Sequence, residues 1–94
     1  MRLSKFEQQT IKQNIYALDA NAKVVLFGSR TDDAARGGDI DLLIISNDLK
    51  RHQLGKIRWQ LWEQLGEQKI DLLLSDTQLS NTFARAVFNK GIIL

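Results

Sequence analysis

The sequence contains no cysteine and no proline among its 94 residues. Without cysteine the chain can form no disulfide, no thiolate nucleophile and no cysteine-based zinc site. That absence also favours a reducing compartment, and we expect a cytoplasmic protein. The absence of proline and of low-complexity tracts argues against linkers between domains. We therefore expect one domain over residues 1–94.

Long hydrophobic runs are missing as well. No apolar stretch approaches the roughly 18 residues of a membrane-spanning helix, and the N-terminus lacks the pattern of a signal peptide. The net charge of +2 is small, which is compatible with an anionic substrate but does not require nucleic acid. Hydrophobic residues nevertheless make up 44% of the chain, enough for a thin core.

Helical and extended patterns alternate along the first part of the chain. Ser4 and Glu7 have the spacing of a capping box, which predicts that a helix begins there. The expected buried stripe of this helix consists of Ile11, Ile15, Leu18 and Ala22. Segment 23–27 is apolar and β-branched, which predicts a strand, and the polar segment 30–36 predicts a turn or a short helix.

Two further strands are expected. Segments 39–45 and 69–74 are apolar apart from their aspartates and terminal residues, and the apolar tail 92–94 could extend the same sheet. With helices between and after these strands, the order of elements predicts an α/β (α+β) fold. We expect a small mixed sheet with helices packed on it.

Two later helices complete the expected fold. Asp48 is expected to cap a helix that ends at Gly66. A last helix is expected to start at Ser75 or Asp76 and to stop at Gly91. The expected stripe of the former helix is Leu54, Ile57, Leu61 and Leu65. The expected stripe of the last helix is Leu79, Phe83, Ala86 and Val87.

Two acids lie in the second expected strand. Because successive strand residues point to opposite faces, Asp39 and Asp41 share one face. Carboxylates so close together repel each other unless a cation neutralises them, and hard oxygen ligands of this kind suit magnesium. A solvated pair at the mouth of a strand is the alternative, and two aspartates alone do not exclude it.

The neighbouring turn favours a phosphate site. Gly28 and Ser29 directly follow a strand, where backbone N–H groups can approach a phosphate closely. The Ser29 hydroxyl can donate to a phosphate oxygen, and Arg30 can add a charge-assisted contact. An ordinary turn between elements is the alternative.

A third acid, Asp71, stands among apolar residues of the third expected strand. The segment "KIDLLL" repeats the local form of "DIDLLI", so pairing of the two strands would let Asp71 face the same site. Three carboxylates beside a phosphate-sized turn suit a two-metal transfer reaction on a nucleotide.

Taken together, these residues resemble the signature of nucleotidyltransferases of the DNA polymerase β superfamily. Gly28-Ser29 is followed, eleven residues after the glycine, by Asp39-Ile40-Asp41-Leu42 and then by an isolated strand aspartate. The length is similar to that of the smallest members, the minimal nucleotidyltransferases. The resemblance implies that the Gly-Ser pair holds the phosphates and that Asp39, Asp41 and Asp71 hold two magnesium ions.

The chain also departs from the pattern of many minimal members. They have an Arg-Gly shortly after the Gly-Ser-Arg and a serine just before the first catalytic aspartate. This sequence has "TDD" and Gly38 at the corresponding places. The departures concern how the loop closes and which acceptor is used, and they remove no expected metal ligand.

The resemblance further implies a partner. Minimal nucleotidyltransferases are commonly paired with a helical HEPN-domain protein. In several pairs they act as antitoxins that attach AMP to a tyrosine of an RNase toxin. We therefore expect a magnesium-dependent nucleotidyltransferase that uses ATP and modifies a HEPN-domain partner, without a membrane and without a requirement for nucleic acid. A binding-only antitoxin, and a nucleotidyltransferase acting on a small molecule or RNA, remain open alternatives.

Two aromatic residues fall outside the expected core stripes. At about 100° per residue, Trp59 points well away from the stripe of its helix, whereas Trp62 lies at the edge of that stripe. Phe6 is similarly off the stripe of the first helix. Aromatic residues are enriched in protein interfaces, so Trp59 is the leading candidate for contact with a partner. Local packing under a neighbouring loop is the alternative.

Overall fold

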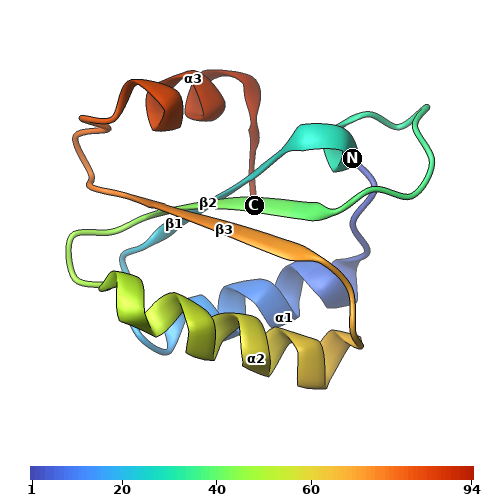
Figure 1. Ribbon diagram of the computed structural model, residues 1–94, viewed down its shortest axis with the longest axis horizontal. Coiled ribbons are helices and arrows are strands. Elements are labelled where there is room, and N and C mark those ends of the chain that lie inside the picture. The colour runs from blue at the N-terminus through green and yellow to red at the C-terminus, as the bar shows by residue number, and fades with distance from the viewer.

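The computed structural model describes residues 1–94 as a four-stranded mixed sheet with helices on both faces (Figure 1). The strands are β1 (Lys23–Phe27), β2 (Ile40–Ile45), β3 (Ile70–Ser75) and β4 (Ile92–Ile93). The helices are α1 (Lys5–Tyr16), α2 (Leu54–Leu65) and α3 (Thr82–Lys90), with short 3-10 helices η1 (Gly28–Thr31) and η2 (Arg51–Gln53). None of these helices combines the length and apolar character needed to span a lipid bilayer.

The strand order in the sheet is β3-β2-β1-β4. The strand β1 runs antiparallel to both β2 and β4, whereas β2 and β3 are parallel. The C-terminal end of β1 therefore lies beside the N-terminal ends of β2 and β3. This arrangement confirms the expected mixed sheet and brings the three segments that carry the predicted site to one end of it.

Each face of the sheet supports its own core. The core under α1 and α2 contains Leu3, Ile11, Ile15, Ala22, Val24, Leu26, Ile40, Leu42, Ile44, Leu49, Ile57, Leu61 and Ile70. The smaller core under α3 contains Val25, Leu43, Ile45, Ala84 and Val87. Because strand residues alternate between faces, Asp41 lies on the α3 face with Leu43 and Ile45.

The first helix begins as predicted and ends earlier than its expected stripe. Ser4 Oγ accepts the Glu7 N–H at 3.0 Å, and Glu7 Oε1 accepts the Ser4 N–H at 3.0 Å, which confirms the capping box. The helix ends at Tyr16, so the prediction that Leu18 belongs to its buried stripe is wrong. Leu18 is 36% exposed, whereas Ala22, also outside the helix, is buried.

The prediction that Asp48 caps the second helix is wrong. The Ser46 hydroxyl oxygen accepts the N–H groups of Asp48 at 3.1 Å and Leu49 at 3.0 Å, which holds a turn at this point. A 3-10 helix follows, and α2 begins only at Leu54. Gly66 ends α2 as expected, with a φ of 89° that favours glycine.

The last helix also begins later than predicted. The Asp76 carboxylate accepts the Ser80 N–H at 2.9 Å and the Ser80 hydroxyl at 2.6 Å, so it closes a turn instead of capping a helix. The cap is Asn81, whose Oδ1 accepts the N–H groups of Phe83 at 2.8 Å and Ala84 at 3.1 Å. The expected start at Ser75 or Asp76 is therefore wrong.

The buried side of α3 differs from its expected stripe. Ala84 and Val87 are buried against the sheet, whereas Ala86 is exposed and Phe83 is 60% exposed. The expected helix included Leu79, which instead lies before α3 with a φ of 53°. Phe83 is thus an exposed aromatic residue and not part of the core.

Candidate functional site

The two strand aspartates meet across the parallel pair of strands. Asp41 on β2 is the register partner of Asp71 on β3. This confirms the expected pairing of the two strands, which places Asp71 beside Asp41. Across β1, Phe27 is the register partner of Asp41. Asp39 immediately precedes β2, so the strand begins one residue later than predicted.

The pKa of the Asp41 carboxyl is raised above its ordinary value. Partial burial raises the pKa of the Asp41 carboxyl, a hydrogen bond with the Asp71 side chain raises it further, and so do the negative charges of Asp71 and Asp39. The ammonium group of Lys69 acts in the opposite direction. The raised pKa is the expected signature of carboxylates gathered without a neutralising cation.

Asp39 is held differently from the other two acids. Its Oδ2 lies 3.6 Å from Lys69 Nζ, in an ion pair whose side chains are 45% and 68% exposed. Exposed ion pairs contribute little to stability, so this contact can be exchanged at small cost. No three acidic or histidine side chains converge closely enough to hold a metal ion as they stand. Asp41 and Asp71 lie side by side, whereas Asp39 pairs with Lys69 instead of joining them.

Gly28 allows the turn after β1 to approach Asp41 closely. Its φ is 75°, a conformation that side chains other than glycine rarely adopt. A Cβ atom at this position would overlap Asp41 Oδ2. Thr31 Oγ1 donates to the Gly28 carbonyl oxygen at 2.7 Å and closes the turn. Ser29, the next residue along the chain, is exposed, and Gly28 lies directly against the Asp41 carboxylate.

Gly38, which departs from the pattern of minimal nucleotidyltransferases, has a steric role. Its φ is 92°, and a Cβ atom there would overlap Ser29 Oγ. A serine at this position would thus collide with the hydroxyl that is predicted to bind phosphate. In this loop, glycine at position 38 leaves room for the Ser29 side chain.

Arg30 makes contacts within the protein. Its Nε donates to the Gly38 carbonyl at 3.2 Å, its Nη1 to the Arg2 carbonyl at 2.9 Å and its Nη2 to Gln68 Oε1 at 3.5 Å. The remaining guanidinium N–H groups are available to an anion. Contact of Arg30 with a nucleotide stays a prediction. Its three hydrogen bonds within the protein hold the loop in place.

Arg2 is the residue of this site that sequence reasoning missed. Its guanidinium donates to three carbonyl oxygens of the loop, those of Ser29 at 2.9 Å, Asp32 at 2.8 Å and Gly37 at 2.7 Å. Its backbone N–H donates to the Arg30 carbonyl at 2.8 Å. Arg2 therefore clamps the loop between β1 and β2 from its start to its end.

Replacing Arg2 with alanine is expected to loosen this loop, because three side-chain hydrogen bonds, each worth about 1 kcal/mol, are lost. Hydrogen exchange of residues 29–38 should accelerate, while exchange of β1 and β2 stays slow. The matched control is Arg36→Ala, which removes an exposed arginine that makes no side-chain hydrogen bond in the same loop. If Arg2→Ala leaves loop exchange unchanged, Arg2 is not a clamp.

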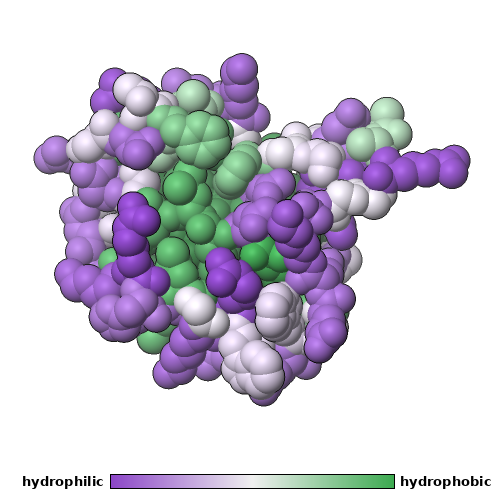
Figure 2. All heavy atoms as spheres, in the orientation of Figure 1, coloured by the Kyte–Doolittle hydropathy of each residue, from purple (hydrophilic) through white to green (hydrophobic).

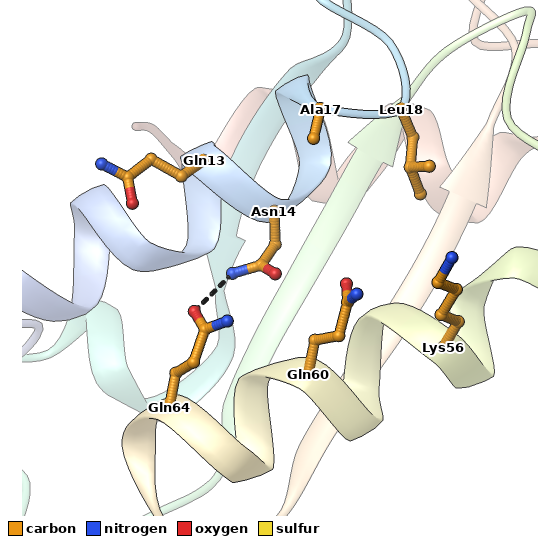
Figure 3. A pocket seen from close by; sticks show the side chains of 7 residues that line it. All are labelled: Gln13, Asn14, Ala17, Leu18, Lys56, Gln60 and Gln64. Carbon is orange, nitrogen blue, oxygen red and sulfur yellow. Dashed lines mark hydrogen bonds between the residues drawn. The ribbon is translucent and has the colours of Figure 1, made fainter.

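A separate hollow of about 280 Å³ lies on the other face of the sheet, between α1 and α2 (Figure 3). Its lining is mainly amide side chains, from Gln13, Asn14, Gln60 and Gln64. Asn14 Nδ2 donates to Gln64 Oε1 at 2.9 Å and to the Thr10 carbonyl at 2.8 Å, which ties the two helices together. None of the predicted site residues lines this hollow, so we assign it a role in helix packing.

The fold and the site together define a class of protein. A small mixed sheet with aspartates on two parallel strands, facing a Gly-Ser turn at the end of a third, is the arrangement of a nucleotidyltransferase fold. The family described as "Polymerase beta, Nucleotidyltransferase" matches residues 9–94 of this chain. The chain belongs to that family, and this membership supports a nucleotidyltransferase-type function. A search of curated proteins finds no match.

Proposed function

We propose that this protein is a magnesium-dependent nucleotidyltransferase that transfers AMP from ATP to a hydroxyl group of a partner protein. The observation that carries the proposal is the pairing of Asp41 with Asp71 directly beside the Gly28–Ser29 turn. Family membership supports nucleotidyl transfer as the reaction type. The test is whether the partner carries covalently attached AMP after incubation with this protein, magnesium and ATP.

The residues present fit a divalent cation. All three acids supply carboxylate oxygens, the ligands that magnesium prefers, and the raised pKa of Asp41 reports negative charge that a cation would neutralise. Asp39 would join the other two by leaving its exposed ion pair with Lys69. Bound magnesium would activate the attacking oxygen and stabilise charge on the transferring phosphoryl group. We propose that Asp39, Asp41 and Asp71 hold two such ions.

The remaining site residues suit the triphosphate. Ser29 can donate its exposed hydroxyl, the turn at Gly28 can present backbone N–H groups, and Arg30 can add positive charge. In the proposed reaction the acceptor hydroxyl oxygen bonds to the α-phosphorus of ATP. The bond from that phosphorus to the β-phosphate oxygen breaks, pyrophosphate leaves, and the hydroxyl proton passes to solvent.

A protein acceptor is supported by the apolar surface of the molecule. Trp59 on α2 is 58% exposed and Phe6 on α1 is 63% exposed, so both lie outside the core as predicted. The strand β3 pairs only with β2, and its leucines are half-buried at this edge of the sheet. Figure 2 shows apolar atoms exposed between the α3 and α2 sides of the molecule. We propose a helical HEPN-domain protein as the partner and an antitoxin role for this chain.

One alternative also has an observation in its favour. Because three metal ligands do not yet converge, a binding-only antitoxin that neutralises its partner by contact alone is the second candidate. The two candidates differ in one result. An enzyme leaves AMP covalently attached to the partner, whereas a binding-only protein leaves the partner unmodified.

Replacing Trp59 with alanine is expected to weaken association with the partner while leaving thermal stability nearly unchanged, because the side chain is 58% exposed. Truncation of an interface tryptophan can cost about 2 kcal/mol or more, which corresponds to roughly thirtyfold in affinity. Co-purification and calorimetry with the partner measure the effect. An unchanged affinity would remove Trp59 from the interface.

The control for Trp59 is its neighbour on the same helix. Trp62 packs against the core, and its Nε1–H donates to the Gln68 carbonyl at 2.7 Å. Trp62→Ala should therefore lower the melting temperature, which Trp59→Ala should not. This contrast separates a surface role from a structural one.

A further inference from the structure

A second hollow lies on the same face of the sheet as the carboxylates. It has a volume of about 360 Å³ and opens between η1 and α3. Phe27, Gly28 and Thr31 line it from the end of β1, and Phe83, Val87 and Lys90 line it from α3. We refer to it as the Phe27–Phe83 hollow. Its volume falls within the range of about 300–1,000 Å³ that is usual for small-molecule sites.

The hollow adjoins the proposed site through one shared residue. Gly28 belongs to both, since it lines the hollow and lies against the Asp41 carboxylate. Phe27 is the register partner of Asp41, so the two side chains are neighbours on one face of the sheet. None of the other three hollows is lined by any of the predicted site residues. A ligand whose phosphates lie at the carboxylates would thus have this hollow beside it.

The lining favours a flat, aromatic group. Phe83 is 60% exposed although it is a large apolar residue, and it has no place in the core of α3. Together with the half-buried Phe27 it offers ring surfaces on which a heterocycle can stack. The polar side chains are few. The Thr31 hydroxyl proton is already donated to the Gly28 carbonyl, and the Lys90 ammonium suits a nearby phosphate better than a base.

We propose that the Phe27–Phe83 hollow binds the nucleobase of the nucleoside triphosphate, while the phosphates lie at the aspartates and the Gly28–Ser29 turn. This inference rests on the proposed function and names the part of the substrate that the aspartates do not contact. Because the lining holds few hydrogen-bonding groups, the base is held mainly by stacking. ATP and GTP are therefore expected to bind with similar affinity.

The test compares ATP with inorganic tripolyphosphate, which carries phosphates but no base. Phe83→Ala is expected to lower the affinity for magnesium-ATP by roughly five- to a hundredfold, the range for loss of one base–aromatic stack. Its affinity for magnesium-tripolyphosphate should equal that of wild type. Phe83→Tyr, which keeps the ring, should retain ATP binding. Calorimetry measures all five affinities, and an unchanged melting temperature shows that each variant is folded.

The matched control is Phe6→Ala, which removes a phenylalanine of similar exposure from α1, on the opposite face of the sheet. It should change neither affinity. If Phe83→Ala leaves ATP affinity unchanged but slows transfer, the hollow holds the acceptor and the inference is overturned. If Phe83→Ala changes neither binding nor transfer, no ligand uses the hollow, and the inference is overturned as well.

These outcomes are distinct from failure of the proposed function. If wild-type protein binds magnesium-tripolyphosphate but Phe83→Ala binds ATP as tightly as wild type does, the proposed phosphate and metal site stands. Only the proposed base site then fails. Wild-type protein that binds neither ATP nor tripolyphosphate overturns both proposals together.

Discussion

The double variant Asp39→Asn/Asp41→Asn is expected to lose magnesium-dependent binding of ATP and to remain folded. Asp41 lies in β2 against Gly28 and Asp39 immediately precedes that strand, and amide oxygens carry no charge to hold a hard divalent cation. Calorimetry with ATP in magnesium, and in excess chelator, measures the effect. Wild type should bind only with magnesium, and the variant should bind in neither condition.

The same double variant is also expected to change how the stability of the protein depends on pH. Because the pKa of Asp41 is raised in the folded protein, its protonated form is favoured by folding. Asp41 therefore contributes to the free energy of unfolding in full below the ordinary carboxyl pKa, and this contribution is lost as pH rises through the raised pKa. Metal-free wild type should lose stability over that pH interval. The double variant should lack this decrease and melt at a higher temperature at neutral pH.

Asp48→Asn serves as the control, because Asp48 is an exposed acid at the other end of β2. It should bind magnesium-ATP as wild type does. Equal affinity of wild type and the double variant for magnesium-ATP would contradict the proposed metal site.

Replacing Asp71 alone with asparagine is expected to separate binding from transfer. Asp39 and Asp41 remain to hold a metal-bound nucleotide, so affinity for ATP and for the partner should change little. Asp71 lies on a different strand, and we assign it to the ion that positions the attacking hydroxyl. Transfer should fall by at least about a hundredfold, the loss that an ångström of misplacement between reacting groups can produce.

Pyrophosphate release in the presence of partner, magnesium and ATP measures the effect of Asp71→Asn. Asp76→Asn is the matched control, since Asp76 follows the opposite end of β3 and is bound to Ser80. It should release pyrophosphate at the wild-type rate. Transfer by Asp71→Asn at that same rate would show that the third carboxylate has no catalytic role.

The sequence predicted the sheet well because its strands carry strong local signals. The β-branched segment of β1 and the apolar segments of β2 and β3 leave little choice of conformation, and the repeated "IDLL" pattern anticipates the register of Asp41 with Asp71. The capping box of Ser4 and Glu7 was predicted equally well, because its two residues are only three positions apart in the sequence. Signals confined to a few neighbouring residues are the ones that sequence patterns capture.

The start of α3 could not be predicted from the sequence, because two residues offer equally good local capping signals. Asp76 and Asn81 are both good capping residues, and the choice depends on which backbone N–H groups each one reaches. Asp76 is occupied by Ser80, and Asn81 therefore caps the helix. With this later start, Phe83 is exposed and lines the hollow beside the site instead of joining the core.

The loop around the site shows a further limit of the sequence. Arg2 contacts carbonyl oxygens 27 to 35 residues away, and a lone basic residue near the N-terminus carries no local signal of such contacts. Arg2 also lies outside the residues 9–94 that the family matches. The ion pair of Asp39 with Lys69 likewise depends on the approach of two segments that are distant in the chain.

The most direct test of the central claim is the mass of the proposed HEPN-domain partner after incubation with this protein, magnesium and ATP. The proposed function predicts that the partner gains the mass of AMP, with release of pyrophosphate, and that chelation of magnesium or the change Asp71→Asn prevents the gain. A partner that forms the complex and is neutralised, yet keeps its original mass with the wild-type protein, would contradict nucleotidyl transfer and establish the binding-only alternative.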